Sequence, residues 1–228
     1  MHHPISRDRA RALLAPLLFA SLVCLALVLA RGVAAERWRF TGLFGNLLLA
    51  WIPLGLALGL DWLARRPKPR PGAFWTCGVV WFLFFPNASY IVTDLVHFKK
   101  WGQDGIPKWF DLLLINAHAF CGVFLGSLAL YLVAGLVRQR FGRRAAAVFA
   151  IGMLALGAFG IYFGRFVRLN SWDVLARPFK LLTDVAALGA PMKAGEVATF
   201  TLVFFLFNVS AYWFIAVALH RNEERVSP

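Results

Sequence analysis

Six long apolar runs dominate this chain and restrict the folds that it can adopt. As a helix, each run is long enough to cross a hydrocarbon layer about 30 Å thick. Of the 228 residues, 60% are hydrophobic and 15% are charged, whereas about 25% of a soluble domain is charged. The sequence therefore predicts an all-α polytopic transmembrane bundle that forms a single domain over residues 1–228. The expected spans are residues 12–30, 41–63, 73–92, 109–137, 145–164 and 197–219.

The first run has two interpretations. Basic residues precede it, and Val33, Ala34 and Ala35 follow it like the cleavage site of a secretory signal peptide. Its apolar stretch is longer than the usual signal core of about 7–15 residues. We therefore favour an uncleaved first span, with a cleaved signal peptide as the alternative.

The positive charges indicate an orientation. The net charge is +13, and many basic residues lie next to the apolar runs, so we expect contacts with anionic lipid headgroups and no nucleic-acid partner. The connections at residues 64–72 and 138–144 are both strongly basic and contain no acidic residue. Compact basic connections tend to stay in the cytoplasm, which predicts that both termini are cytoplasmic.

Residues 172–190 have a different pattern from the six runs. Apolar and charged residues both recur at helical spacing there, as in Trp172, Leu175 and Phe179 beside Asp173 and Arg177. This predicts an amphipathic helix that lies in the outer membrane interface. The alternative is a core helix that caps the bundle.

Polar residues within the runs gather toward the outer end of the expected bundle. A charge at the centre of a membrane costs about 2.5–3.5 kcal/mol on insertion scales, so each such residue calls for a partner or a function. Asp111 and His118 are seven residues apart and share one helix face. The other members of the gathering are Asn46, Asn87, Tyr90, Thr93, Arg165 and Arg168, with Asn208 and Tyr212 deeper in the last run.

Two dense motifs supply most of these polar residues. Residues 85–94 read FPNASYIVTD and continue to His97, and residues 164–173 read GRFVRLNSWD. Both motifs resemble the signature segments of an uncharacterised bacterial membrane family catalogued as domain of unknown function 1361. The resemblance covers most of the chain and implies a multi-span protein of a bacterial inner membrane. It implies no reaction, substrate or catalytic residue.

The polar gathering supports several hypotheses about function. Asp94, His97, Asp111 and His118 are carboxylate and imidazole groups that are weak candidates for a metal site or for proton exchange. Their spacing matches no defined ligand motif, and no cofactor can be named from the sequence. In a structural interpretation, Arg165 and Arg168 neutralise nearby carboxylates and the polar cluster only locks the helices together.

The sharpest functional hypothesis is a polar extracytoplasmic pocket that binds or processes a phosphate-bearing lipid headgroup or a small polar substrate. Arginine pairs suit phosphoryl oxygens, which they bind through two parallel hydrogen bonds. The catalytic candidates are Asp94, His97 and Asp173. The candidate ligand-binding residues are Asn87, Tyr90, Thr93, Asp111, His118, Arg165, Arg168, Asn170 and Trp172.

A transporter of small solutes or ions is the alternative from another class. Such proteins use broken helices, internal repeats and ionisable residues near the midplane of the membrane. Pro86 interrupts the third run, but the two halves of the sequence show no convincing repeat. The inner half of the bundle also has few polar residues, which favours a one-sided pocket over a through-route.

Overall fold

The computed structural model describes residues 7–68, 70–167, 183 and 191–224, and these residues form helices without any strand. The prediction of an all-α helical bundle is confirmed. The elements in chain order are α1 (Arg7–Ala35), α2 (Gly42–Ala64), α3 (Pro71–Phe84), α4 (Pro86–Tyr90), the 3₁₀ helix η1 (Ile91–Lys100), α5 (Lys108–Tyr162), the π-helix η2 (Phe163–Val167) and α8 (Pro191–Glu224).

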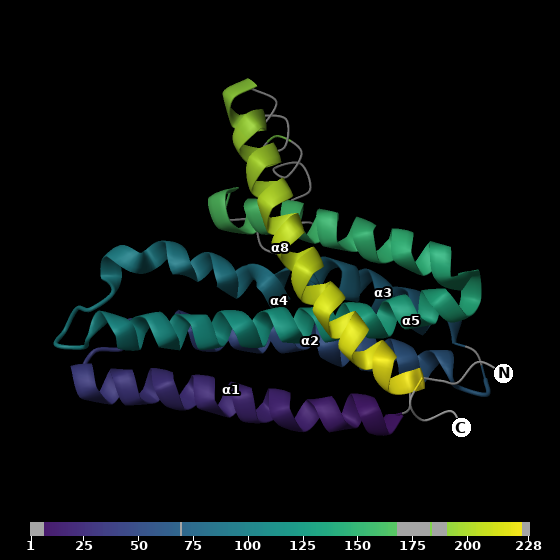
Figure 1. Cartoon of the computed structure of the whole chain (residues 1–228), viewed down its shortest axis with the longest axis horizontal. Helices are drawn as coiled ribbons and strands as arrows, with labels where there is room; N and C mark the ends of the chain where they lie inside the picture. Colours follow the sequence, from purple (N-terminus) through teal and green to yellow (C-terminus); the bar gives the residue numbers. More distant parts are fainter. Residues whose placement is uncertain (1–6, 69, 168–182, 184–190, 225–228) are drawn as a thin grey trace.

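Five helical stretches within the described residues are long and apolar enough to cross a membrane. The six apolar runs fit into five stretches because α5 contains two of them. Gly142 interrupts α5 with a φ of +89°, a conformation that glycine adopts without steric cost. The chain reverses there, and the second arm of α5 runs back along the bundle (Figure 1).

The third run is interrupted at Phe85, where the first motif begins, and changes from α-helix to 3₁₀ helix at Ile91. Pro86 is the first residue of α4, where its missing N–H is no loss, and the chain continues through η1. Helix α4 packs closely against α5 at Ala88. A Cβ atom on Gly122 would collide with the carbonyl oxygen of Ala88, and one on Gly126 would lie 2.9 Å from the Ala88 Cβ. The glycines of α5 therefore allow the motif to pack against the central helix.

The connections between helices gather at two ends of the bundle (Figure 1). The start of α1, the connection between α2 and α3, the turn at Gly142 and the end of α8 lie at one end, which we call the basic end. The connections at residues 36–41 and 101–107 lie at the other, which we call the loop end. The two strongly basic connections thus lie on the same side.

The first arm of α5 is the centre of the fold, since α5 contacts α1, α2, α4, η1, η2 and α8. Helix α8 crosses the others obliquely (Figure 1). Its outward side chains are well exposed, including Trp213 and Phe214 at 69% and 70%. The expected interfacial helix at residues 172–190 falls almost entirely outside the described residues.

Candidate functional site

The deepest ion pair at the loop end joins α1 to α5. Nε of Arg31 donates a hydrogen bond to Oδ1 of Asp111 across 2.7 Å, and Nη2 donates to Oδ2 across 3.4 Å. Both side chains are almost completely buried, with exposed fractions of 1% and 0%. The guanidinium of Arg31 also lies over the ring of Phe40, 4.6 Å from its centroid. A buried carboxylate and a buried guanidinium thereby neutralise one another.

Asp111 also fastens the connection at residues 101–107. Its Oδ2 accepts a hydrogen bond from the backbone N–H of Gly102 across 2.9 Å. Within the same connection, Asp104 receives two hydrogen bonds from Arg39 and lies 3.9 Å from Nη2 of Arg31. The hydrogen bond from Arg39 holds the pKa of the Asp104 carboxyl below its ordinary value, with smaller contributions from the charges of Arg39, Arg37 and Arg31.

A second ion pair joins the two sequence motifs. Nη1 of Arg165, in η2, donates to Oδ1 of Asp94, in η1, across 3.0 Å. The other carboxylate oxygen of Asp94 accepts a hydrogen bond from Nδ2 of Asn46 across 2.7 Å. Arg165 also contacts Tyr90, whose hydroxyl lies 3.5 Å from Nη1. Three segments that are distant in sequence therefore meet at one carboxylate.

His118 lies beside this second cluster and is completely buried. Its Nδ1 is 2.8 Å from the carbonyl oxygen of Leu114, and because a carbonyl can only accept, Nδ1 carries the proton. In the neutral ring Nε2 is then an acceptor, and it has no hydrogen-bond partner among the described residues. Asp94 is close enough to act on the ring electrostatically. The cluster therefore has a buried imidazole beside its carboxylate.

The structure groups the predicted site residues differently from the sequence. It brings together Tyr90, Asp94 and Arg165, with His118 nearby, while the Thr93 hydroxyl donates to the backbone carbonyl of Tyr90 across 2.6 Å. Asn87 is part of α4, the helix that ends at Tyr90. Asp111 lies outside this group, in the separate pair with Arg31. The other predicted residues fall outside the described part of the chain: the His97 side chain, Arg168, Asn170, Trp172 and Asp173.

Arg31, the partner of Asp111, is a site residue that sequence reasoning missed. The sequence predicts a first span that ends at residue 30, whereas α1 continues to Ala35 and carries Arg31 inside the bundle. The structural hypothesis paired the motif arginines with the carboxylates. Asp94 does meet Arg165, but Asp111 meets Arg31 instead. A lone arginine within an apolar helix, with a buried carboxylate available, was the signal that could have found it.

A metal site gains no support from this geometry. Across residues 7–68, 70–167 and 191–224, no group of three His, Cys, Asp or Glu side chains is arranged to hold an ion. Asp94 and Asp111 each have an arginine partner in place of a cation.

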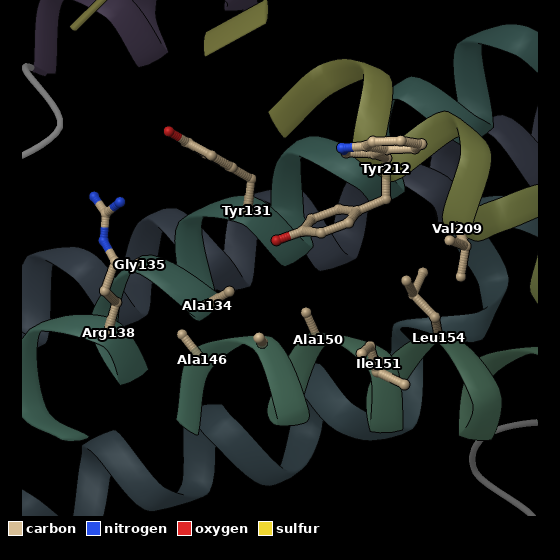
Figure 2. A pocket seen from close by; sticks show the side chains of 12 residues that line it. Tyr131, Ala134, Gly135, Arg138, Ala146, Ala150, Ile151, Leu154, Val209 and Tyr212 are labelled. Atoms are coloured by element: carbon tan, nitrogen blue, oxygen red, sulfur yellow. The ribbon is translucent and has the colours of Figure 1, made fainter. Parts of the chain in front are cut away.

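The polar pocket expected at the loop end also gains no support. A cavity of about 310 Å³ lies instead toward the basic end, between the two arms of α5 and helix α8 (Figure 2). Its lining is mostly alanine and branched aliphatic side chains, with Tyr131, Arg138 and Tyr212 as the polar groups.

Long apolar helices, with charged side chains paired inside the bundle, define a helical membrane protein. A family model described as "Protein of unknown function (DUF1361)" matches residues 45–211, which include both motifs. The chain belongs to this family, and the resemblance noted from the motifs is confirmed. No curated protein and no solved structure matches the chain.

Proposed function

We propose that the chain is a multi-pass protein of the bacterial inner membrane with both termini in the cytoplasm. The charge distribution supports this orientation, because the two basic connections and the start of α1 lie at the same end of the bundle. The buried pair between Arg31 and Asp111 also supports an uncleaved α1. Removal of that helix would leave Asp111 buried without its guanidinium partner.

Within this membrane protein, we propose that the polar cluster has a structural role and locks the helices together. The proposal depends on one observation: the charges of the cluster, buried in one pair and partly buried in the other, neutralise each other across long separations in sequence. Arg31 and Asp111 are 80 residues apart, and Arg165 and Asp94 are 71 residues apart. Each pair ties an element at the edge of the bundle to the motif or to the central helix.

The energetic argument rests on what remains when one partner is lost. Removal of one member of a buried ion pair typically costs about 3–5 kcal/mol, because the other charge stays buried without compensation. Replacement of both members by apolar side chains of similar volume is often close to neutral. For a pair that locks helices together, single substitutions should therefore lower stability strongly, and the double apolar substitution should lower it little.

The Arg165 and Asp94 pair provides the test. We expect Arg165→Ala and Asp94→Ala each to lower the melting temperature in detergent by several degrees, and Arg165→Met combined with Asp94→Leu to recover much of the loss. The control is Arg65→Ala, which removes an exposed pair with Asp61 and should change stability little. An Arg165→Ala protein that melts like the wild type would contradict the structural role.

A phosphate-bearing lipid headgroup bound at Arg165 is the second candidate function. Two observations favour it: Arg165 lies on a π-helical turn, a distortion frequent at functional sites, and Nε2 of His118 is a buried acceptor beside Asp94. In this function, Arg165 would turn from the carboxylate of Asp94 to the phosphoryl oxygens of the headgroup.

The two functions predict opposite results for the same variant. A headgroup site predicts that Arg165→Ala folds normally but retains less of its phospholipid after purification, as measured by native mass spectrometry. A locking pair predicts the reverse, with lowered stability and lipid retention unchanged per folded molecule. Arg165→Lys keeps the charge but not the two-pronged geometry, so it should weaken headgroup binding more than it weakens folding.

A further inference from the structure

The cavity at the basic end is separate from the polar cluster and has features of a lipid site. Its walls come from three helical segments: the end of the first arm of α5, the start of the second arm, and the middle of α8. Its volume of about 310 Å³ lies at the lower end of the roughly 300–1,000 Å³ typical of ligand pockets. The small side chains of Ala134, Gly135 and Ala150 leave this space open between the arms.

The polar groups of the cavity lie toward one side of it. Arg138 is half-buried, and Figure 2 shows the hydroxyl of Tyr212 directed along the cavity toward the side where Arg138 lies. The two groups are close enough to interact electrostatically. A guanidinium and a phenol hydroxyl both donate hydrogen bonds, so together they suit an anionic oxygen.

The surroundings of Arg138 strengthen this preference for an anion. The turn that follows it contains three exposed arginines and no acidic residue within residues 138–144. Basic residues near a membrane surface are attracted to the headgroups of anionic lipids. The exposed arginines of the turn are Arg140, Arg143 and Arg144.

The opposite side of the cavity faces the apolar flank of the bundle. Ile151 and Trp213 both line the cavity, and they are 55% and 69% exposed on helices that are apolar enough to span a membrane. An opening with such a rim is accessible to acyl chains. An apolar wall and a cationic mouth at the same cavity match the two halves of a phospholipid.

We propose that this cavity binds one anionic phospholipid molecule from the surrounding leaflet. One acyl chain lies against the small and aliphatic side chains between the two arms of α5 and α8. The phosphate accepts hydrogen bonds from Arg138 and Tyr212 at the mouth. This site is independent of the function proposed for Arg165 and Asp94, since the residues of the two regions do not overlap.

The test uses the full chain reconstituted in vesicles of equimolar phosphatidylglycerol and phosphatidylcholine. After gentle extraction, native mass spectrometry counts the lipids that remain bound to each chain. We expect one phosphatidylglycerol on the wild type and about tenfold lower occupancy for Arg138→Gln, because a charge-assisted hydrogen bond is lost. The matched control is Arg140→Gln, which removes an exposed arginine that does not line the cavity.

A second variant tests the acyl chain separately from the charge. Ile151→Trp fills the opening and should also lower occupancy, whereas Val148→Trp, at a 72% exposed position that does not line the cavity, should not. Both positions are well exposed, so both variants are expected to fold. The proposal would be overturned if the wild type retained as much phosphatidylcholine as phosphatidylglycerol. It would also be overturned if Arg138→Gln and Ile151→Trp left the occupancy unchanged, or if the two control variants lost as much bound lipid as these variants do.

Discussion

Arg31 and Asp111 face each other across 2.7 Å at the loop end, and both are closed to solvent. Asp111 at the same time holds the backbone N–H of Gly102. One carboxylate therefore connects α1, the central helix and the connection that precedes it.

We predict that Arg31→Ala and Asp111→Ala each destabilise the protein strongly, by about 3–5 kcal/mol, because the partner charge stays buried. Arg31→Met combined with Asp111→Leu should be less damaging than either single change. Recovery will be incomplete, since Gly102 still loses its acceptor. Thermal unfolding in detergent measures all three variants, and additive losses in the double variant would contradict the pairing.

The carboxyl of Asp104 gives a prediction about pH. Arg39 and its neighbours lower the pKa of this carboxyl in the folded protein, so the ionised form is favoured by folding. The resulting stability is complete above the ordinary pKa of about 3.9 and is lost as the pH falls through the lowered pKa. The wild type should therefore lose melting temperature in that acidic range, and Asp104→Asn should lose less. Parallel pH profiles for the two proteins would show that Asp104 contributes nothing.

Close packing of the first motif on α5 predicts a large effect from a small substitution. Gly122→Ala places a methyl group against the carbonyl oxygen of Ala88, so α4 must move and the protein is destabilised. Gly55→Ala is the matched control, because nothing lies near that position and alanine favours a helix by about 0.5–1 kcal/mol. Melting curves should shift in opposite directions for the two variants.

A hydrogen bond between α4 and α8 also admits a matched comparison. Ser89 Oγ donates to Oδ1 of Asn208 across 2.7 Å, and Asn208 is buried. Asn208→Leu should cost about 1–3 kcal/mol by leaving the half-buried Ser89 hydroxyl without its acceptor. Ser210 lies two residues further along the same helix, and its exposed hydroxyl donates to the Leu206 carbonyl of that helix. Ser210→Ala should therefore change stability little. Similar losses for both would argue against a specific link.

The proposed orientation is testable with single cysteines. In a variant without Cys24, Cys77 and Cys121, Lys108→Cys should react in intact cells with a maleimide that does not cross membranes. Lys68→Cys should react only after the membrane is opened. These positions lie at the loop end and the basic end, and the reverse pattern of labelling would place the termini outside.

The sequence predicted the helices well because their length and apolarity are local properties. It also identified Asp94, Arg165 and Asp111 as residues that needed partners. The choice among partners depends on which helix faces meet, and that is a property of the whole bundle. For this reason, the structural interpretation left open which carboxylates Arg165 and Arg168 would meet, and Arg31, the partner of Asp111, went unnoticed.

The cavity could not be foreseen for a related reason. Polar residues near the loop end suggested a pocket there, but their side chains contact one another. The hollow near Arg138 depends on small residues that meet across two arms of one helix, and alanine or glycine in an apolar run more often indicates close packing.

The abrupt reversal at Gly142 has a consequence for biosynthesis. With so little chain between them, we expect the two arms of α5 to enter the bilayer jointly, as a hairpin whose tip carries four guanidinium groups. Moving that tip through the hydrocarbon would be very costly, so in the proposed orientation we expect it to stay on the side where the ribosome delivers it. A single glycine would then help to determine, during synthesis, which way the finished molecule points.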